Sequence, residues 1–120
     1  MIYITTILLV ATKFLDCYST NKGLTIINME TNPIARKIMN CFGKKNAIWT
    51  IFFLALIIIT ICSYTAITFN SVIYKISFII LGLLISLIQL SVAITNFGKK
   101  YNTITKQIYI FHKILEKILK

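Results

Sequence analysis

Three long apolar stretches, residues 2–23, 47–69 and 73–97, constrain the fold of this chain more than any other feature. The second stretch has no charged residue, and the third has only Lys75, close to its start. A helix of about 20 apolar residues, rising about 1.5 Å per residue, crosses the hydrocarbon core of a bilayer. A backbone in lipid must satisfy its own hydrogen bonds. We therefore expect three transmembrane helices, although so many isoleucines would favour strands in water.

The composition and charge also indicate an integral membrane protein. Of the 120 residues, 58% are hydrophobic and only 13% are charged, whereas soluble domains contain about 25% charged residues. A soluble chain of this length could not bury so much apolar surface in one core. The net charge of +10 would also suit a nucleic-acid-binding protein. The basic residues, however, lie at the ends of the apolar stretches, so we expect the lipid bilayer as partner and no nucleic acid.

The first apolar stretch could be either a secretory signal peptide or a retained transmembrane helix. A signal peptide begins with a positively charged region, and no basic residue lies between Met1 and the start of the apolar run. We therefore expect a retained helix. The predicted fold class is all-α, with a three-helix transmembrane domain over residues 1–98 and a basic amphipathic cytoplasmic tail over residues 99–120.

The polar segment between the first two apolar stretches contains the start of a short helix. Asn32 is a good N-cap residue, and Pro33 is favoured at the first helical position. The pattern predicts a helix over residues 33–42 that ends at Gly43. Because its apolar residues share one side, we expect it to lie along the membrane interface; they are Ile34, Ile38 and Phe42.

The C-terminal tail has one apolar stripe with a helical spacing. Its apolar residues recur every three or four positions over residues 103–120 and are Ile104, Ile108, Phe111, Leu115 and Ile118. One interpretation is a helix that rests on the anionic lipids of the inner leaflet. The other is a short coiled coil that assembles copies of the chain, for which two heptads are little evidence.

The distribution of basic residues predicts the orientation in the membrane. Residues 22–45 contain five basic residues against one carboxylate, and residues 99–120 contain six lysines against one carboxylate. With three crossings these two segments share a side, and the opposite side has only Lys75. The positive-inside rule then predicts a multi-pass protein of the cell (inner) membrane, with its N-terminus outside and its C-terminus in the cytoplasm.

Two of the predicted transmembrane helices have matching polar faces. On a helical wheel, Thr5, Thr12, Ser19, Thr20 and Gly23 lie within about 60° of Asp16, and Gly82, Ser86, Gln89, Ala93 and Asn96 lie within about 80° of one another. We expect these faces to meet, with Asp16 level with Gln89 and Gly23 near Asn96. We call the set Asp16, Ser19, Thr20, Gln89 and Asn96 the polar seam.

The polar seam has two interpretations. Intramembrane carboxylates and amides often mark ion or proton pathways, because polar groups in lipid are costly. Amides and hydroxyls also hold transmembrane helices together, and Lys13 could simply neutralise Asp16 from three residues away. The sequence alone does not separate a conducting seam from a structural one.

A pair of short motifs provides a resemblance. The segment Asp16-Cys17-Tyr18-Ser19-Thr20 reads D-x-x-S-T, and the segment from Glu30 to Arg36, which includes Asn32 and Pro33, reads E-x-N-P-x-x-R. With these motifs the chain resembles an uncharacterised family of small prokaryotic multi-pass membrane proteins over about residues 10–100. That family has no established activity, so the resemblance implies a membrane protein, singles out Asp16, Glu30, Asn32 and Arg36, and supplies no substrate.

Glu30 and Arg36 also have a local explanation. Glu30 lies just before the predicted helix start, where the helix dipole stabilises a carboxylate. Arg36 could reach back to Glu30 or bind a lipid phosphate.

Catalytic and metal-binding motifs are missing from the sequence. The three cysteines, Cys17, Cys41 and Cys62, are widely spaced, which does not suit a zinc or redox motif. His112 is the only histidine, and Glu116 is the only carboxylate near it in sequence. We therefore expect no enzyme activity, no cofactor and no metal.

Two functional hypotheses remain. The first is a cation or proton channel or transport protein that uses the polar seam. Three helices are too few to surround a pore, so this function requires a homo-oligomer or partner subunits. The second is a non-catalytic structural or accessory subunit, which uses the seam to dock against helices of a larger membrane complex.

Overall fold

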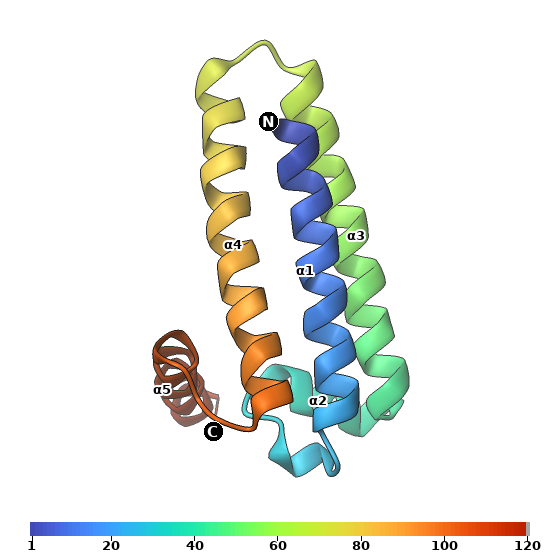
Figure 1. Ribbon diagram of the computed structural model, residues 1–120. Helices are drawn as coiled ribbons and strands as arrows, with labels where there is room; N and C mark the ends of the chain where they lie inside the picture. The colour runs from blue at the N-terminus through green and yellow to red at the C-terminus, as the bar shows by residue number, and fades with distance from the viewer. Residues whose placement is uncertain (120) are drawn as a thin grey trace.

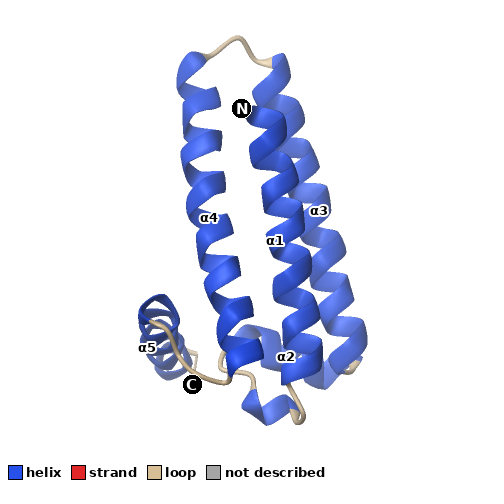
Figure 2. Cartoon of the chain, in the orientation of Figure 1, coloured by secondary structure: helices blue, strands red, loops and turns tan. Residues whose placement is uncertain are grey.

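The computed structural model describes residues 1–119, and all the regular structure within them is helical (Figure 2). Helices α1 (Ile2–Gly23) and α2 (Pro33–Phe42) have the predicted bounds. Helix α3 (Lys44–Thr68) begins at residue 44 rather than 47, and α4 (Val72–Gly98) is one residue longer at each end than predicted. Helix α5 (Thr103–Ile118) covers most of the predicted tail helix, of which Lys120 lies outside the described residues. A short 3-10 helix, η1 (Ile27–Met29), was not anticipated.

Helices α1, α3 and α4 are the three described helices that can span a membrane. They are 22, 25 and 27 residues long, and each is apolar enough to cross the hydrocarbon core. Most of their large apolar side chains are exposed on the outside of the bundle. In water this surface would be unfavourable, whereas lipid accommodates it. The structure therefore agrees with the prediction of an integral membrane protein with three apolar spans.

Helix α1 lies between α3 and α4 and packs against both, most extensively against α4, whereas α3 and α4 contact each other much less (Figure 1). The packing of α1 on α4 depends on a glycine. A Cβ atom added to Gly82 would overlap Cγ2 of Thr5 and lie 3.2 Å from Cδ1 of Leu9. The missing side chain lets the two helices approach closely, as small residues do in membrane helix pairs.

Helices α2 and α5 lie at the end of the bundle where α1 and α4 finish, opposite the N-terminus (Figure 1). We call this the basic end, because it carries the two basic segments, residues 22–45 and 99–119. The side chain of Asn32 caps α2 by accepting hydrogen bonds from the backbone N–H groups of Ile34 and Ala35. Gly43, with φ of 80°, lets the chain turn directly from α2 into α3.

A small apolar core joins α2 to the membrane-spanning helices. It consists of Cys17, Met39, Ala47 and Ile48. Of the apolar residues expected to share one side of α2, Ile38 packs against this core, whereas Ile34 and Phe42 are exposed. Lys44 donates to the carbonyl oxygens of Asn21 (3.3 Å) and Leu24 (2.7 Å). This lysine therefore provides a positive charge at the C-terminus of α1, where the helix dipole favours it.

Candidate functional site

The predicted polar faces of α1 and α4 meet in the structure. The hydroxyl of Thr12 donates to Oε1 of Gln89 over 2.8 Å. The amide nitrogen of Asn96 donates to the hydroxyls of Ser19 (3.2 Å) and Thr20 (3.0 Å). The backbone carbonyl of Asn96 also lies 3.2 Å from where a Cβ of Gly23 would stand, so these two residues are neighbours as expected.

One expected pairing within the polar seam differs from the prediction. Gln89 was expected to lie level with Asp16, but its bonded partner on α1 is Thr12, one helical turn farther from the basic end. Asp16 instead pairs with Lys13 on its own helix, with an Nζ–Oδ2 distance of 2.8 Å. Near the basic end the expected level is kept, because Gly23 and Asn96 are neighbours. Counting residues from the helix ends does not, however, predict which side chains bond to each other, because side-chain packing decides that.

The contacts of the polar seam are mainly hydrogen bonds between α1 and α4. Among residues 1–119, no buried side-chain nitrogen or oxygen lacks a hydrogen-bond partner. Each such bond between transmembrane helices contributes about 0.6 kcal/mol on average. Four seam residues thus hold the two helices of one chain together: Ser19, Thr20, Gln89 and Asn96. The carboxylate of Asp16 instead pairs with a residue of its own helix.

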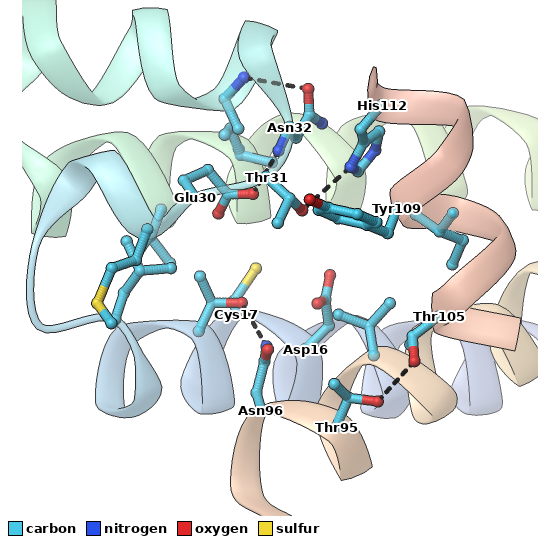
Figure 3. Close-up of a pocket in the computed structure, with 18 of the residues that line it drawn as sticks. Asp16, Cys17, Glu30, Thr31, Asn32, Thr95, Asn96, Thr105, Tyr109 and His112 are labelled. Atoms are coloured by element: carbon cyan, nitrogen blue, oxygen red, sulfur yellow. Dashed lines mark hydrogen bonds between the residues drawn. The ribbon is translucent and has the colours of Figure 1, made fainter. Parts of the chain in front are cut away.

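Asp16 and Lys13 both line a cavity of about 390 Å³ at the basic end, which we call the vestibule. The vestibule lies between α1, α4, the segment before α2, and α5 (Figure 3). Its volume corresponds to roughly a dozen water molecules. The polar side of its lining includes Lys13, Asp16, Thr20, Glu30, Thr31, Asn32, Thr95, Asn96, Thr105, Tyr109 and His112. The apolar side includes Ile48, Ile51, Ile88 and Val92.

Glu30 brings a second carboxylate to the vestibule. Its Oε1 accepts the backbone N–H of Asn32 over 2.9 Å, and its own carbonyl accepts Nε–H of Arg36 over 3.0 Å. Arg36 therefore reaches back to Glu30 as predicted, but it contacts the backbone rather than the carboxylate. Burial raises the pKa of Glu30 above its usual value. Pro33 occupies the first turn of α2, so Glu30 and Asn32 lie close to the start of that helix.

Helix α5 forms the remaining wall of the vestibule. The hydroxyl of Thr31 and Nδ1 of His112 are hydrogen-bonded over 3.1 Å, and Nη1 of Arg36 lies 3.5 Å from Oε1 of Glu116. Burial lowers the pKa of His112, so the imidazole is mainly neutral at neutral pH. No sequence pattern pairs His112 with Thr31, since 81 positions separate them.

A second cavity of about 200 Å³ adjoins the vestibule on the far side of the Thr31–His112 contact. We call it the outer pocket. Its lining includes Asn28, Arg36, Lys113 and Glu116, which do not line the vestibule. The two cavities share Met29, Glu30, Thr31, Tyr109 and His112.

Within the described residues, no group of three or more His, Cys, Asp or Glu side chains is arranged to hold a metal ion. Comparison of the chain with protein-family models, curated proteins and solved structures finds no match.

Proposed function

We propose that the chain is a small transport protein of the cell membrane that takes a cation or proton from the cytoplasm into the vestibule beside Asp16. One observation carries the proposal: Asp16 and Glu30, from two separate parts of the chain, line the same cavity. The chain has 13 basic residues and only three acidic ones. Two of its three carboxylates thus lie beside one cavity at the basic end.

The position of Asp16 supports a functional role. A carboxylate within a membrane span is costly unless it has a partner or contacts water, and such residues commonly mark ion or proton pathways. Asp16 has both a partner, Lys13, and a cavity beside it. The polar seam beyond it is closed by hydrogen bonds between α1 and α4. A complete pathway across the membrane therefore requires contacts with further copies of the chain or with partner subunits.

The proposed orientation follows from charge. Residues 22–45 and 99–119 carry most of the basic residues and lie at one end of the bundle (Figure 1). The positive-inside rule places this end in the cytoplasm and the N-terminus outside. Helix α5 fits an interfacial position, because the exposed Phe111 and Ile118 lie on the opposite side of the helix from Lys106 and Lys113. Anionic lipids of the inner leaflet are the partner that this arrangement suits.

The decisive experiment separates transport from a structural role of the Lys13–Asp16 pair. The chain is purified in detergent and reconstituted in liposomes, and proton and potassium flux are measured together with yield and particle mass. Asp16→Asn should fold and assemble normally but lose flux. Lys75→Met, which removes a charge from a span without touching the vestibule, is the control and should retain flux.

A double variant covers the case in which Asp16→Asn fails to fold. Breaking a buried ion pair strands one charge at a cost of about 3–5 kcal/mol, whereas removing both charges is far less costly. Lys13→Met with Asp16→Leu should therefore restore yield and particle mass without restoring flux. Full flux in either the folded single variant or the double variant would refute the transport proposal.

An accessory subunit is the second candidate function, and the outer surface of α3 favours it. This helix has a continuous exposed apolar surface that includes Phe53, Leu54, Ile57, Ile58 and Ile61. Because the polar seam is used within the chain, docking to a larger complex would involve this apolar surface. Mass measurement of the particle purified in mild detergent distinguishes the candidates. A closed homo-oligomer supports transport, and stable co-purification with unrelated chains supports the accessory role.

A further inference from the structure

Helix α5 is held firmly to the bundle at its beginning. The side-chain amide of Asn102 donates to the carbonyl of Ser91 over 2.9 Å. The hydroxyls of Thr95 and Thr105 are hydrogen-bonded over 2.9 Å, and both residues are buried. Asn102 and Thr105 also form a capping box that secures the first turn of α5. This end of the helix is a suitable hinge.

The second half of α5 is held by weaker contacts with the segment around the start of α2. One is the Thr31–His112 hydrogen bond of 3.1 Å. Another is the ion pair between Arg36 and Glu116, whose side chains are 28% and 35% exposed and whose N–O distance is 3.5 Å. Ion pairs with this exposure contribute little to stability, because water screens them. The second half of α5 is therefore easier to displace than the first.

The Thr31–His112 contact also lies between two cavities. Both residues line the vestibule on one side and the outer pocket on the other. In Figure 3 the two side chains meet on one side of the vestibule, across from Asp16 and Cys17 on α1. Separating them would join the two cavities, and the outer pocket includes the exposed Lys113.

We propose that α5 is a lid that opens and closes the vestibule from the basic end, with Thr31 and His112 as its latch and residues 99–105 as its hinge. What passes the lid depends on the proposed function, but the motion itself does not. The lid would control how widely Asp16 is reached from the basic end, because α5 forms one wall of a vestibule whose other walls belong to α1–α4 and the segment before α2.

The latch should also respond to pH. In the closed lid, burial keeps the pKa of His112 below its ordinary value of 6.5, and in the open lid the exposed imidazole regains that value. The closed state is therefore fully stable above about pH 6.5 and becomes less stable as the pH falls below it. The charged and titratable groups that line the two cavities with His112 are Lys13, Asp16 and Cys17 on α1, Glu30 before α2, Arg36 on α2, Tyr101 before α5, and Tyr109, Lys113 and Glu116 on α5. Of these, burial raises the pKa of Glu30 above its ordinary value of 4.5.

The native Cys17 provides a direct test, because it lines the vestibule and is 4% exposed. With Cys41→Ser and Cys62→Ser as background, a membrane-impermeant maleimide is applied from the basic end, and the rate of Cys17 labelling is measured. Thr31→Val and His112→Leu should each raise the rate about fivefold, the population change expected from losing one ordinary hydrogen bond. Thr50→Val is the matched control, since Thr50 is exposed near the start of α3 and lines neither cavity.

A locked lid provides the opposite perturbation. Thr31→Cys with His112→Cys should form a disulfide that slows Cys17 labelling well below the background rate, and reduction should restore it. Equal labelling rates in the background, the latch variants and the locked variant would overturn the lid. Labelling needs no transport, so a lid that opens in a protein without flux would refute the proposed function and leave this inference standing.

Discussion

Gly82→Ala tests the close packing of α1 on α4. The new methyl group would overlap Cγ2 of Thr5 and lie 3.2 Å from Cδ1 of Leu9, and both side chains are buried. Thr5 cannot easily rotate away, because its hydroxyl donates to the carbonyl of Met1 over 3.1 Å and its β-branched side chain is stiff. The two helices must therefore separate locally.

The expected magnitude follows from two opposing effects. Overpacking a well-packed interface costs about 1–3 kcal/mol. Replacing glycine by alanine inside a helix gains up to about 1 kcal/mol. We expect Gly82→Ala to lower the free energy of unfolding by about 1–2 kcal/mol, measured by SDS titration of the protein in mixed micelles.

Two further variants make this measurement decisive. Gly98→Ala adds the same methyl group at the end of α4, where nothing lies within 4 Å, and should leave stability almost unchanged. Thr5→Ser combined with Gly82→Ala removes the overlapping atom and keeps the hydroxyl, so it should recover part of the loss, which is the non-additivity expected of residues in contact. If Gly82→Ala is as stable as Gly98→Ala, the close packing described above is incorrect.

The remaining predictions concern pH and orientation. The rate of Cys17 labelling, divided by the rate for the unfolded chain at each pH, should rise as the pH falls from about 7.5 to about 5.5. His112→Asn should abolish this rise. An unchanged pH profile in that variant would exclude His112 as the titrating group. For the orientation, a membrane-impermeant thiol reagent should label a cysteine replacing Ser71 from outside intact cells. Cysteines replacing the exposed Lys45 and Lys100 should react only in inverted vesicles, and their labelling in intact cells would reverse the proposed topology.

The membrane spans and the short helix at their base were predictable because their signals are local. An apolar run of sufficient length must be helical in lipid, and the bounds of α1 follow directly from it. The start of α2 follows from Asn32 and Pro33, because capping needs only the next three residues. Helical periodicity also identified the faces of α1 and α4 that meet, since a wheel depends only on residue spacing within one helix.

Only the tertiary structure decided which residues of those faces become partners. Periodicity assigns a residue to a face but does not name its bonded partner on another helix, so the hydrogen bond between Gln89 and Thr12 was not predicted. The vestibule depends on where α5 lies against the segment before α2, and no sequence pattern links Thr31 to His112 across 81 positions. Local backbone physics determines the helices from sequence alone, whereas side-chain packing between distant segments determines the register, the cavity and the candidate site.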